Sequence, residues 1–224
     1  MIAISTKTMT RETSQWMAKL FVIVSLMMAA MLAAHPARAA AANPAEAFVQ
    51  QNVDRGYAIL NNKELSKDDR RAQFRQFMLT LTDTRRIGMF TLGQYVNSAS
   101  KPDVDAFLNA FTDYAIAVYE SRLSKYSGQT LKVTGSQQRA ADDVIVLTNV
   151  ADPEMPNAQP IKAAFRVRKG QDGRMIVTDI QVEGVWLALS ERSDFTGFLQ
   201  QHGGSVPALT TDLKHQTEQL RENT

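Results

Sequence analysis

The 224-residue sequence carries 25 basic and 23 acidic side chains and no cysteine, and 44% of its residues are hydrophobic. The nearly balanced charge offers no electrostatic basis for binding nucleic acid, and the missing cysteines exclude a disulfide scaffold, a thiol nucleophile and a thiolate metal site. A chain of this length can bury a core of its own, so one folded domain is expected.

Residues 1–39 are typical of a secretory signal peptide. Basic side chains precede an apolar run at 20–34, and Ala37 and Ala39 then supply the small residues of a cleavage site. The run is shorter than the about 20 residues that span a membrane, which favours a cleaved signal over an anchor. We therefore expect an exported domain at 40–224. It has 21 basic and 22 acidic side chains, because residues 1–39 hold four of the basic and one of the acidic residues.

Helical spacing of apolar residues dominates the first part of this domain. Asn43 and Ser66 are N-cap residue types that predict the starts of two helices. A longer helix is expected over 102–126, where apolar and aromatic residues recur every three or four positions and Gly128 follows as a terminator.

From Leu131 onward the apolar period changes to two. Strands are predicted from Leu131 and over 143–150, 161–168 and 175–182, without helices between them, which indicates an antiparallel meander. Two helices follow, separated by Gly203 and Gly204. The predicted fold class is therefore α+β, with a four-stranded antiparallel sheet packed against several helices.

Two motifs resemble parts of known functional sites, but each lacks the other residues that such a site requires. Gly88 and Gly93 have the spacing of a phosphate-binding loop, but Gln94 and Tyr95 stand where Lys and Ser or Thr are needed, and a helix precedes them. The "HGGS" at 202–205 is similar to an oxyanion-hole motif, yet no Gly-x-Ser-x-Gly nucleophile motif occurs. We expect no enzyme activity, no cofactor and no metal site.

The surplus of apolar and aromatic residues leaves two interpretations open. They form a tightly packed core, or the helices splay from the sheet and leave a cavity suited to apolar ligands. The residues alone favour the packed core.

Three segments resemble signatures of the MlaC family, also called the toluene-tolerance family. "DTRRIGMFTLGQYV" (83–96) resembles the family pattern D-x-x-x-I-a-x-f-x-L-G-x-y-w, and "FLNAFTDYAIAVYESRLSKYSGQTLKV" (107–133) resembles its aromatic helix. "DIQVEGVWLALSERSDFTGFLQQHGG" (179–204) is similar to the family ending. The three occur in the family order, and the resemblance covers about residues 45–213.

The resemblance implies a soluble periplasmic lipid carrier with a nuclear-transport-factor-2-like fold. Such a carrier holds phospholipid acyl chains in an apolar pocket and exchanges lipid with an inner-membrane ABC transporter complex and an outer-membrane lipoprotein–porin complex, which maintains outer-membrane lipid asymmetry. One branch of the family accompanies hopanoid synthesis, so hopanoids or other apolar molecules are the alternative cargo. We expect a monomer that makes transient contacts with membrane proteins.

Candidate pocket residues come from the first signature, one face of the long helix and alternate strand positions. They are Phe90, Leu92, Tyr95, Phe111, Tyr114, Val118, Val133, Val146, Phe165, Val167, Ile180 and Trp186. Residues 87–95 are interpreted as a hinge between helices at the pocket, with Gly88 and Gly93 permitting close packing.

Trp186 departs from the family pattern, because many members carry serine there. An inward-facing indole would narrow the pocket; a core position is the alternative. Arg85, Arg86 and Arg192 are candidates for contact with a lipid phosphate, against the alternative of solvated surface arginines.

Overall fold

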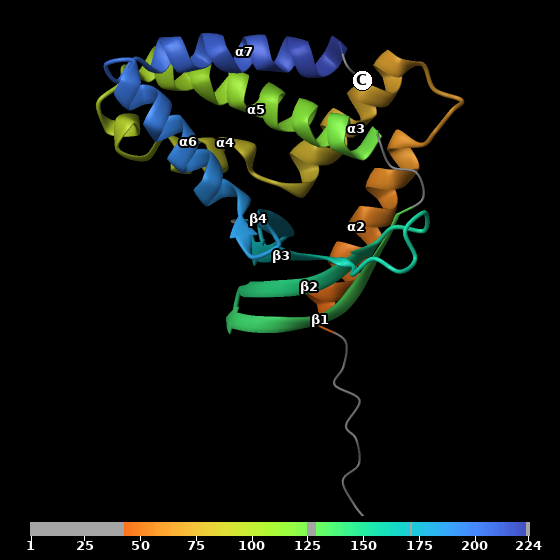
Figure 1. Ribbon diagram of the computed structural model, residues 1–224. Helices are drawn as coiled ribbons and strands as arrows, with labels where there is room; N and C mark the ends of the chain where they lie inside the picture. The colour runs from red at the N-terminus through yellow and green to blue at the C-terminus, as the bar shows by residue number, and fades with distance from the viewer. Residues whose placement is uncertain (1–42, 125–128, 171, 223–224) are drawn as a thin grey trace, which may run out of the picture. The chain divides into compact units, whose positions relative to one another are not determined.

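The computed structural model describes residues 43–124, 129–170 and 172–222. The predicted signal peptide, residues 1–39, lies outside the described residues, as do Tyr126 and Gly128 at the end of the predicted long helix. The described residues belong to one compact unit, in which helices lie on one face of an antiparallel sheet (Figure 1).

The helices follow the predicted pattern, with two additional helical elements at 84–92 and 93–97. In chain order they are α2 (Pro44–Leu60), α3 (Lys67–Leu81), α4 (Thr84–Leu92), the 3-10 helix η1 (Gly93–Asn97), α5 (Lys101–Ser124), α6 (Leu187–Gln201) and α7 (Val206–Glu222). The stretch 87–95, interpreted as a hinge, instead continues α4 and enters η1, because Asp83 caps a new helix by accepting the Arg86 N–H at 3.0 Å. Within the described chain, no helix is both long and apolar enough to cross a bilayer.

Local caps set the first helix starts. Asn43 accepts the N–H of Ala45 at 3.0 Å, and the Ser66 hydroxyl accepts the N–H of Asp69 at 3.1 Å. Both predicted caps are thus confirmed. Each satisfies a backbone donor that the first turn of a helix leaves without an internal partner.

The sheet has five strands rather than the four predicted. They are β1 (Thr130–Ala140), β2 (Asp143–Ala151), β3 (Ile161–Lys169), β4 (Met175–Val182) and β5 (Val185–Trp186), paired antiparallel in chain order. β5 has two residues and follows a turn in which Glu183 and Gly184 both have positive φ, 47° and 84°. A strand this short shows no alternation in the sequence, so the period-two pattern missed it.

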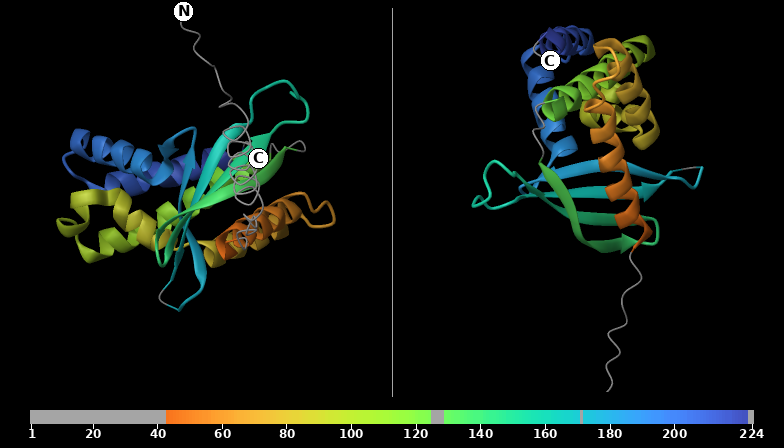
Figure 2. Two further views of the ribbon diagram at one scale, coloured as in Figure 1. Left: turned by 90° about the horizontal axis from the view of Figure 1, so that it is seen from below. Right: turned by 90° about the vertical axis from the view of Figure 1, so that its right-hand side faces the viewer.

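Three apolar clusters hold these layers together. One joins α4, α5, α6 and α7 around the fully buried Phe107 and Leu199. The second joins α2 to the sheet around Val146, and the third joins α2, α3 and α5 around Phe74. α2 therefore reaches from the helical layer down to β1 and β2, as the right-hand view of Figure 2 shows.

Candidate lipid-binding cavity

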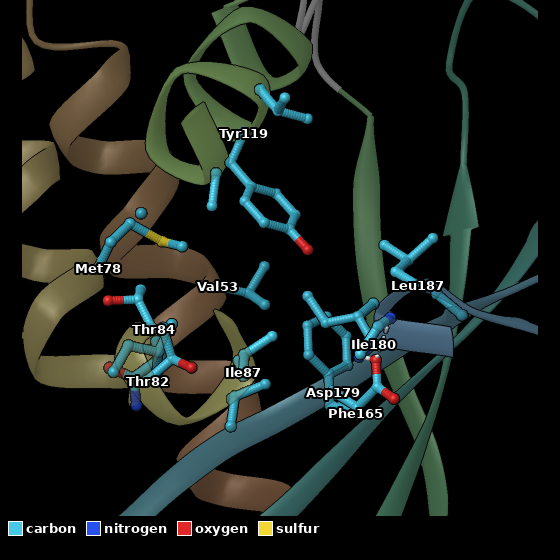
Figure 3. A pocket seen from close by; sticks show the side chains of 18 of the residues that line it. Val53, Met78, Thr82, Thr84, Ile87, Tyr119, Phe165, Asp179, Ile180 and Leu187 are labelled. Atoms are coloured by element: carbon cyan, nitrogen blue, oxygen red, sulfur yellow. Dashed lines mark hydrogen bonds between the residues drawn. The ribbon is translucent and has the colours of Figure 1, made fainter. Parts of the chain in front are cut away.

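An apolar cavity of about 390 Å³ lies between the sheet and helices α2 to α6. The helices contribute Val53, Phe77, Met78, Ile87 and Val118 among others, and the strands contribute Leu131, Val150, Phe165, Ile180 and Val182. Figure 3 shows Val53, Met78 and Ile87 on one side of this space and Phe165 and Ile180 on the other. The helices therefore stand off this part of the sheet, so the apolar residues do not all enter a filled core.

One face of α5 forms the roof of the cavity. Phe111, Tyr114, Ala115, Val118 and Tyr119 all line it. Their spacing of three, four, seven and eight positions places them on one side of a helix with 3.6 residues per turn. The ring of Tyr119 reaches from α5 into the space above Val53 and Ile180 (Figure 3).

Alternate residues of the strands form the floor. Phe165 on β3 lies directly opposite Ile180 on β4, and Ala163 lies opposite Val182. Directly opposed residues of an antiparallel pair point to the same face, so each pair presents both side chains to the cavity.

Asp179 fixes the end of β4 to the start of α6. Its Oδ1 accepts the N–H of Ala188 at 3.1 Å and the N–H of Ile180 at 2.8 Å. The N-cap residue of α6, Trp186, makes no side-chain capping bond. Asp179 therefore acts as the cap of α6 from a neighbouring strand. Since both elements line the cavity, this contact sets one edge of it.

Burial at this position disfavours the ionised form of the Asp179 carboxyl. Burial raises the pKa of Asp179 above its ordinary value of 3.8, against the opposing effect of the two backbone N–H donors and the charge of Arg166. Removal from water is thus the larger effect, although the helix N-terminus favours the ionised form.

Besides Asp179, the polar side chains in the wall are Asn52, Thr82, Thr84, Glu191 and three tyrosines, and its other residues are apolar or glycine. Thr82 Oγ1 is buried and has no hydrogen-bond partner in the described part of the chain. The neighbouring Thr84 hydroxyl pairs with that of Thr112 at 2.9 Å. Among the described residues, no group of three or more His, Cys, Asp or Glu side chains could hold a metal ion. The walls are suited to hydrocarbon rather than to a polar ligand.

The family model described as MlaC protein matches residues 50–215. The chain belongs to the MlaC family. The match begins within α2, includes the complete sheet and ends within α7, so of the residues that line the cavity only Val49 lies outside it.

A solved structure shares this MlaC fold. It is a phospholipid-binding protein from Ralstonia solanacearum, determined in complex with a phospholipid. The two chains are 23% identical, with a TM-score of 0.64, over 79% of this chain and 98% of the other. At this identity the comparison establishes the fold.

The structure brings part of the predicted MlaC pocket together. The cavity wall includes five of the candidate residues, namely Phe111, Tyr114, Val118, Phe165 and Ile180. All five come from the predicted face of α5 or from alternate positions of β3 and β4. Contact of these residues with lipid stays a prediction.

The other strand candidates lie under α2. Val133, Val146 and Val167 are on the cavity face of the sheet, but they pack in the cluster that includes Ala45 and Val49 of α2. The predicted alternation is therefore right for these strands, whereas α2 fills the part of the face above them.

The candidates from the first signature also lie away from the cavity. Leu92 is fully buried among α4 to α7, and Tyr95 packs against that cluster. Phe90 is 40% exposed, with the guanidinium of Arg192 over its ring at 4.9 Å. Within this signature, Thr84 and Ile87 face the cavity instead.

Trp186 and the three candidate arginines also lie outside the cavity wall. Trp186 on β5 lies opposite Gln181 on β4 and is absent from the cavity wall. Its indole therefore does not narrow the cavity. Arg85 forms an exposed ion pair with Asp105 at 2.7 Å, and Arg192 stacks on Phe90. Neither arginine lines the cavity, and nor does Arg86.

Sequence reasoning missed the contribution of the first two helices. Val53 of α2 and Phe74, Phe77 and Met78 of α3 line the cavity. Their helical spacing was visible as an apolar stripe. The sequence carried no signal that this stripe faces a cavity.

Proposed function

We propose that this protein is a non-enzymatic phospholipid carrier that holds acyl chains in the cavity between the sheet and α2 to α6. The observation that carries the proposal is an apolar cavity of about 390 Å³ in a member of the MlaC family. The Ralstonia solanacearum protein of the same fold binds phospholipid, which supports this cargo.

The size of the cavity sets its capacity. An engineered cavity of about 150 Å³ binds benzene, which corresponds to about 25 Å³ per carbon. On that scale the cavity takes on the order of 16 carbons, the length of one acyl chain. Burying such a chain at about 0.8 kcal/mol per CH₂ releases on the order of 13 kcal/mol before ordering costs. We therefore expect the walls to separate when a lipid with two acyl chains binds.

The carrier would work in the periplasm, exchanging phospholipid between the outer membrane and an inner-membrane ABC transporter and so maintaining outer-membrane lipid asymmetry. The predicted signal peptide at 1–39 supports export. The strong retention expected for a buried acyl chain means that release requires a partner with its own apolar path, which favours direct contact with membrane complexes on both sides. An outer-membrane lipoprotein–porin complex would be the second partner.

Native mass spectrometry of the protein purified without detergent tests the cargo. We expect about one phospholipid per chain. A hopanoid bound in its place would identify the alternative cargo. A protein that is consistently empty and takes no lipid from phospholipid vesicles would contradict the carrier function.

Transfer and location need separate measurements. Fractionation of cells that express the full chain should place the processed protein in the periplasm. Fluorescent phospholipid should move between donor and acceptor vesicles faster in its presence. Retention of an unprocessed chain in the cytoplasm would contradict the proposed route without affecting the lipid-binding result.

A further inference from the structure

A second cavity, of about 210 Å³, lies at the turn between α2 and α3. Glu120 of α5 lines this cavity, whereas the adjacent Tyr119 lines the apolar one. Leu60, also in its wall, belongs to the apolar cluster that contains Phe74 and Phe77. Apolar side chains of this cluster therefore lie between the two cavities, whose walls share no residue.

Cations dominate the wall of this second cavity, which we call the basic pocket. It is lined by Lys63, Lys67, Arg70 and Arg71, with Glu120 as the single carboxylate. Four positive charges against one negative charge produce a strongly positive local field in a chain whose total charge is close to balanced.

The single carboxylate is already neutralised. Glu120 accepts a hydrogen bond from Arg71 Nε at 3.0 Å, and its side chain is 10% exposed. Arg71 Nη2 also donates to the Arg221 carbonyl at 3.0 Å. Because a buried carboxylate needs such a partner, Arg71 serves the fold. The other cations in the wall are Lys63, Lys67 and Arg70.

Two of those cations keep unused donors. Arg70 donates from Nη1 to the Asn62 carbonyl at 3.3 Å, while its Nε and Nη2 have no partner among the described residues. Lys63 has no hydrogen bond or ion pair with any described residue. The nearby Asp69 does not line the pocket and accepts the Ser66 hydroxyl at 2.6 Å. Unused donors of Lys63 and Arg70 therefore remain in this wall.

We propose that the basic pocket binds a phosphate group, supplied either by free phosphate or by the headgroup of an anionic lipid. The planar guanidinium of Arg70 can donate two parallel bonds to phosphate oxygens, and Lys63 adds a compact positive charge. A volume of about 210 Å³ equals roughly seven water molecules, at about 30 Å³ each, which accommodates a phosphate. The proposal does not depend on lipid binding in the apolar cavity.

Amide chemical shifts during titration with inorganic phosphate test the site, with sodium chloride at the same ionic strength as the reference. We expect saturable shifts around Lys63, Arg70 and Glu120 with phosphate only. The double variant Lys63→Gln/Arg70→Gln should bind phosphate at least tenfold more weakly. The matched control Lys132→Gln/Lys162→Gln removes the same charge from exposed sheet positions and should stay within twofold of the parent.

Vesicles identify the source of the phosphate. If phosphatidylglycerol vesicles bind the protein and displace inorganic phosphate, while phosphatidylcholine vesicles do not, the pocket takes a lipid headgroup. If inorganic phosphate binds and neither kind of vesicle competes, the ligand is free phosphate. The proposal is overturned if chloride produces the same shifts, if the parent shows no saturation, or if the control pair weakens binding as much as the pocket pair.

Discussion

Asp179 on β4 and Ala188 in the first turn of α6 are joined by a hydrogen bond of 3.1 Å from the Ala188 N–H to the Asp179 carboxylate. This bond replaces the missing cap at Trp186 and ties a strand to a helix across the β5 turn. Residues of both elements face the apolar cavity, so this bond lies at its edge.

Substitution of Asp179 should separate the role of the acceptor oxygen from that of the charge. Asp179→Ala leaves two N–H groups without their acceptor and should lower the free energy of unfolding by about 1–3 kcal/mol. Asp179→Asn retains an acceptor oxygen and avoids placing a charge in a partly buried site. It should match or exceed the parent at pH 7 in urea denaturation. Equal losses for both variants would show that the charge itself is required.

The pH dependence of stability provides a second test of Asp179. Since burial raises its pKa above 3.8, the folded state holds the proton more tightly than the unfolded state. The parent should therefore lose stability relative to Asp179→Asn as the pH rises from 3.8 through the raised pKa, and the difference should then level off. A stability difference that grows in the opposite direction would contradict a raised pKa.

Gly88 should tolerate no side chain. A methyl group there would lie 2.8 Å from Leu108 Cδ2 and 2.9 Å from Phe111 Cδ1. Gly88→Ala should therefore destabilise the protein by about 1–3 kcal/mol, since a packed core resists added volume. Gly197→Ala is the matched control within α6, where a methyl group meets nothing within 4 Å. It should stabilise by about 0.5–1 kcal/mol through helix propensity. Thermal unfolding of both variants measures the contrast.

Filling the apolar cavity should exclude the proposed lipid. Ala115 lies on the α5 face that lines the cavity. A phenyl ring takes about 150 Å³ by the benzene comparison, so Ala115→Phe should reduce co-purifying lipid at least fivefold. Ala106→Phe adds the same ring at an exposed position of α5 and should leave lipid unchanged. Native mass spectrometry measures the number of lipids per chain in each variant. Normal lipid content in Ala115→Phe would exclude this cavity as the lipid-binding site.

The ion pair of Asp143 and Arg166 should stabilise the β2–β3 part of the sheet. Two bonds of 3.0 and 2.6 Å from Arg166 hold the pKa of Asp143 below 3.8. Asp143→Asn should cost about 1–2 kcal/mol at pH 7, because the carboxylate is buried while Arg166 stays partly exposed. The cost should persist above pH 3.8 and vanish as the pH falls through the lowered pKa.

The exposed pair of Asp172 and Arg174 provides the control for this ion pair. Asp172→Asn removes a carboxylate that also bonds an arginine, at 2.6 Å, but both side chains are more than half exposed. Its effect on denaturant unfolding should be small at every pH. A loss as large as that of Asp143→Asn would show that burial is not the cause of the difference.

Some of the predicted pocket residues line the cavity, whereas others on the same face of the sheet are covered by α2. The spacing on α5 and the alternation on β3 and β4 placed Phe111, Tyr114 and Ile180 on the correct faces. The same alternation also selected Val146 and Val167, which α2 covers. Alternation defines a face, whereas the position of α2 on that face depends on contacts between residues about a hundred positions apart.

By itself, the sequence determined the α+β class, the first helix starts and the faces of the main strands, because caps and periodicity act between neighbouring residues. Tertiary structure alone decided that helices α3 to α6 stand off the sheet, that Asp179 caps a helix nine residues away and that Arg71 meets Glu120. These features arise from packing between separate elements, where the free energy depends on which surfaces meet and not on local pattern.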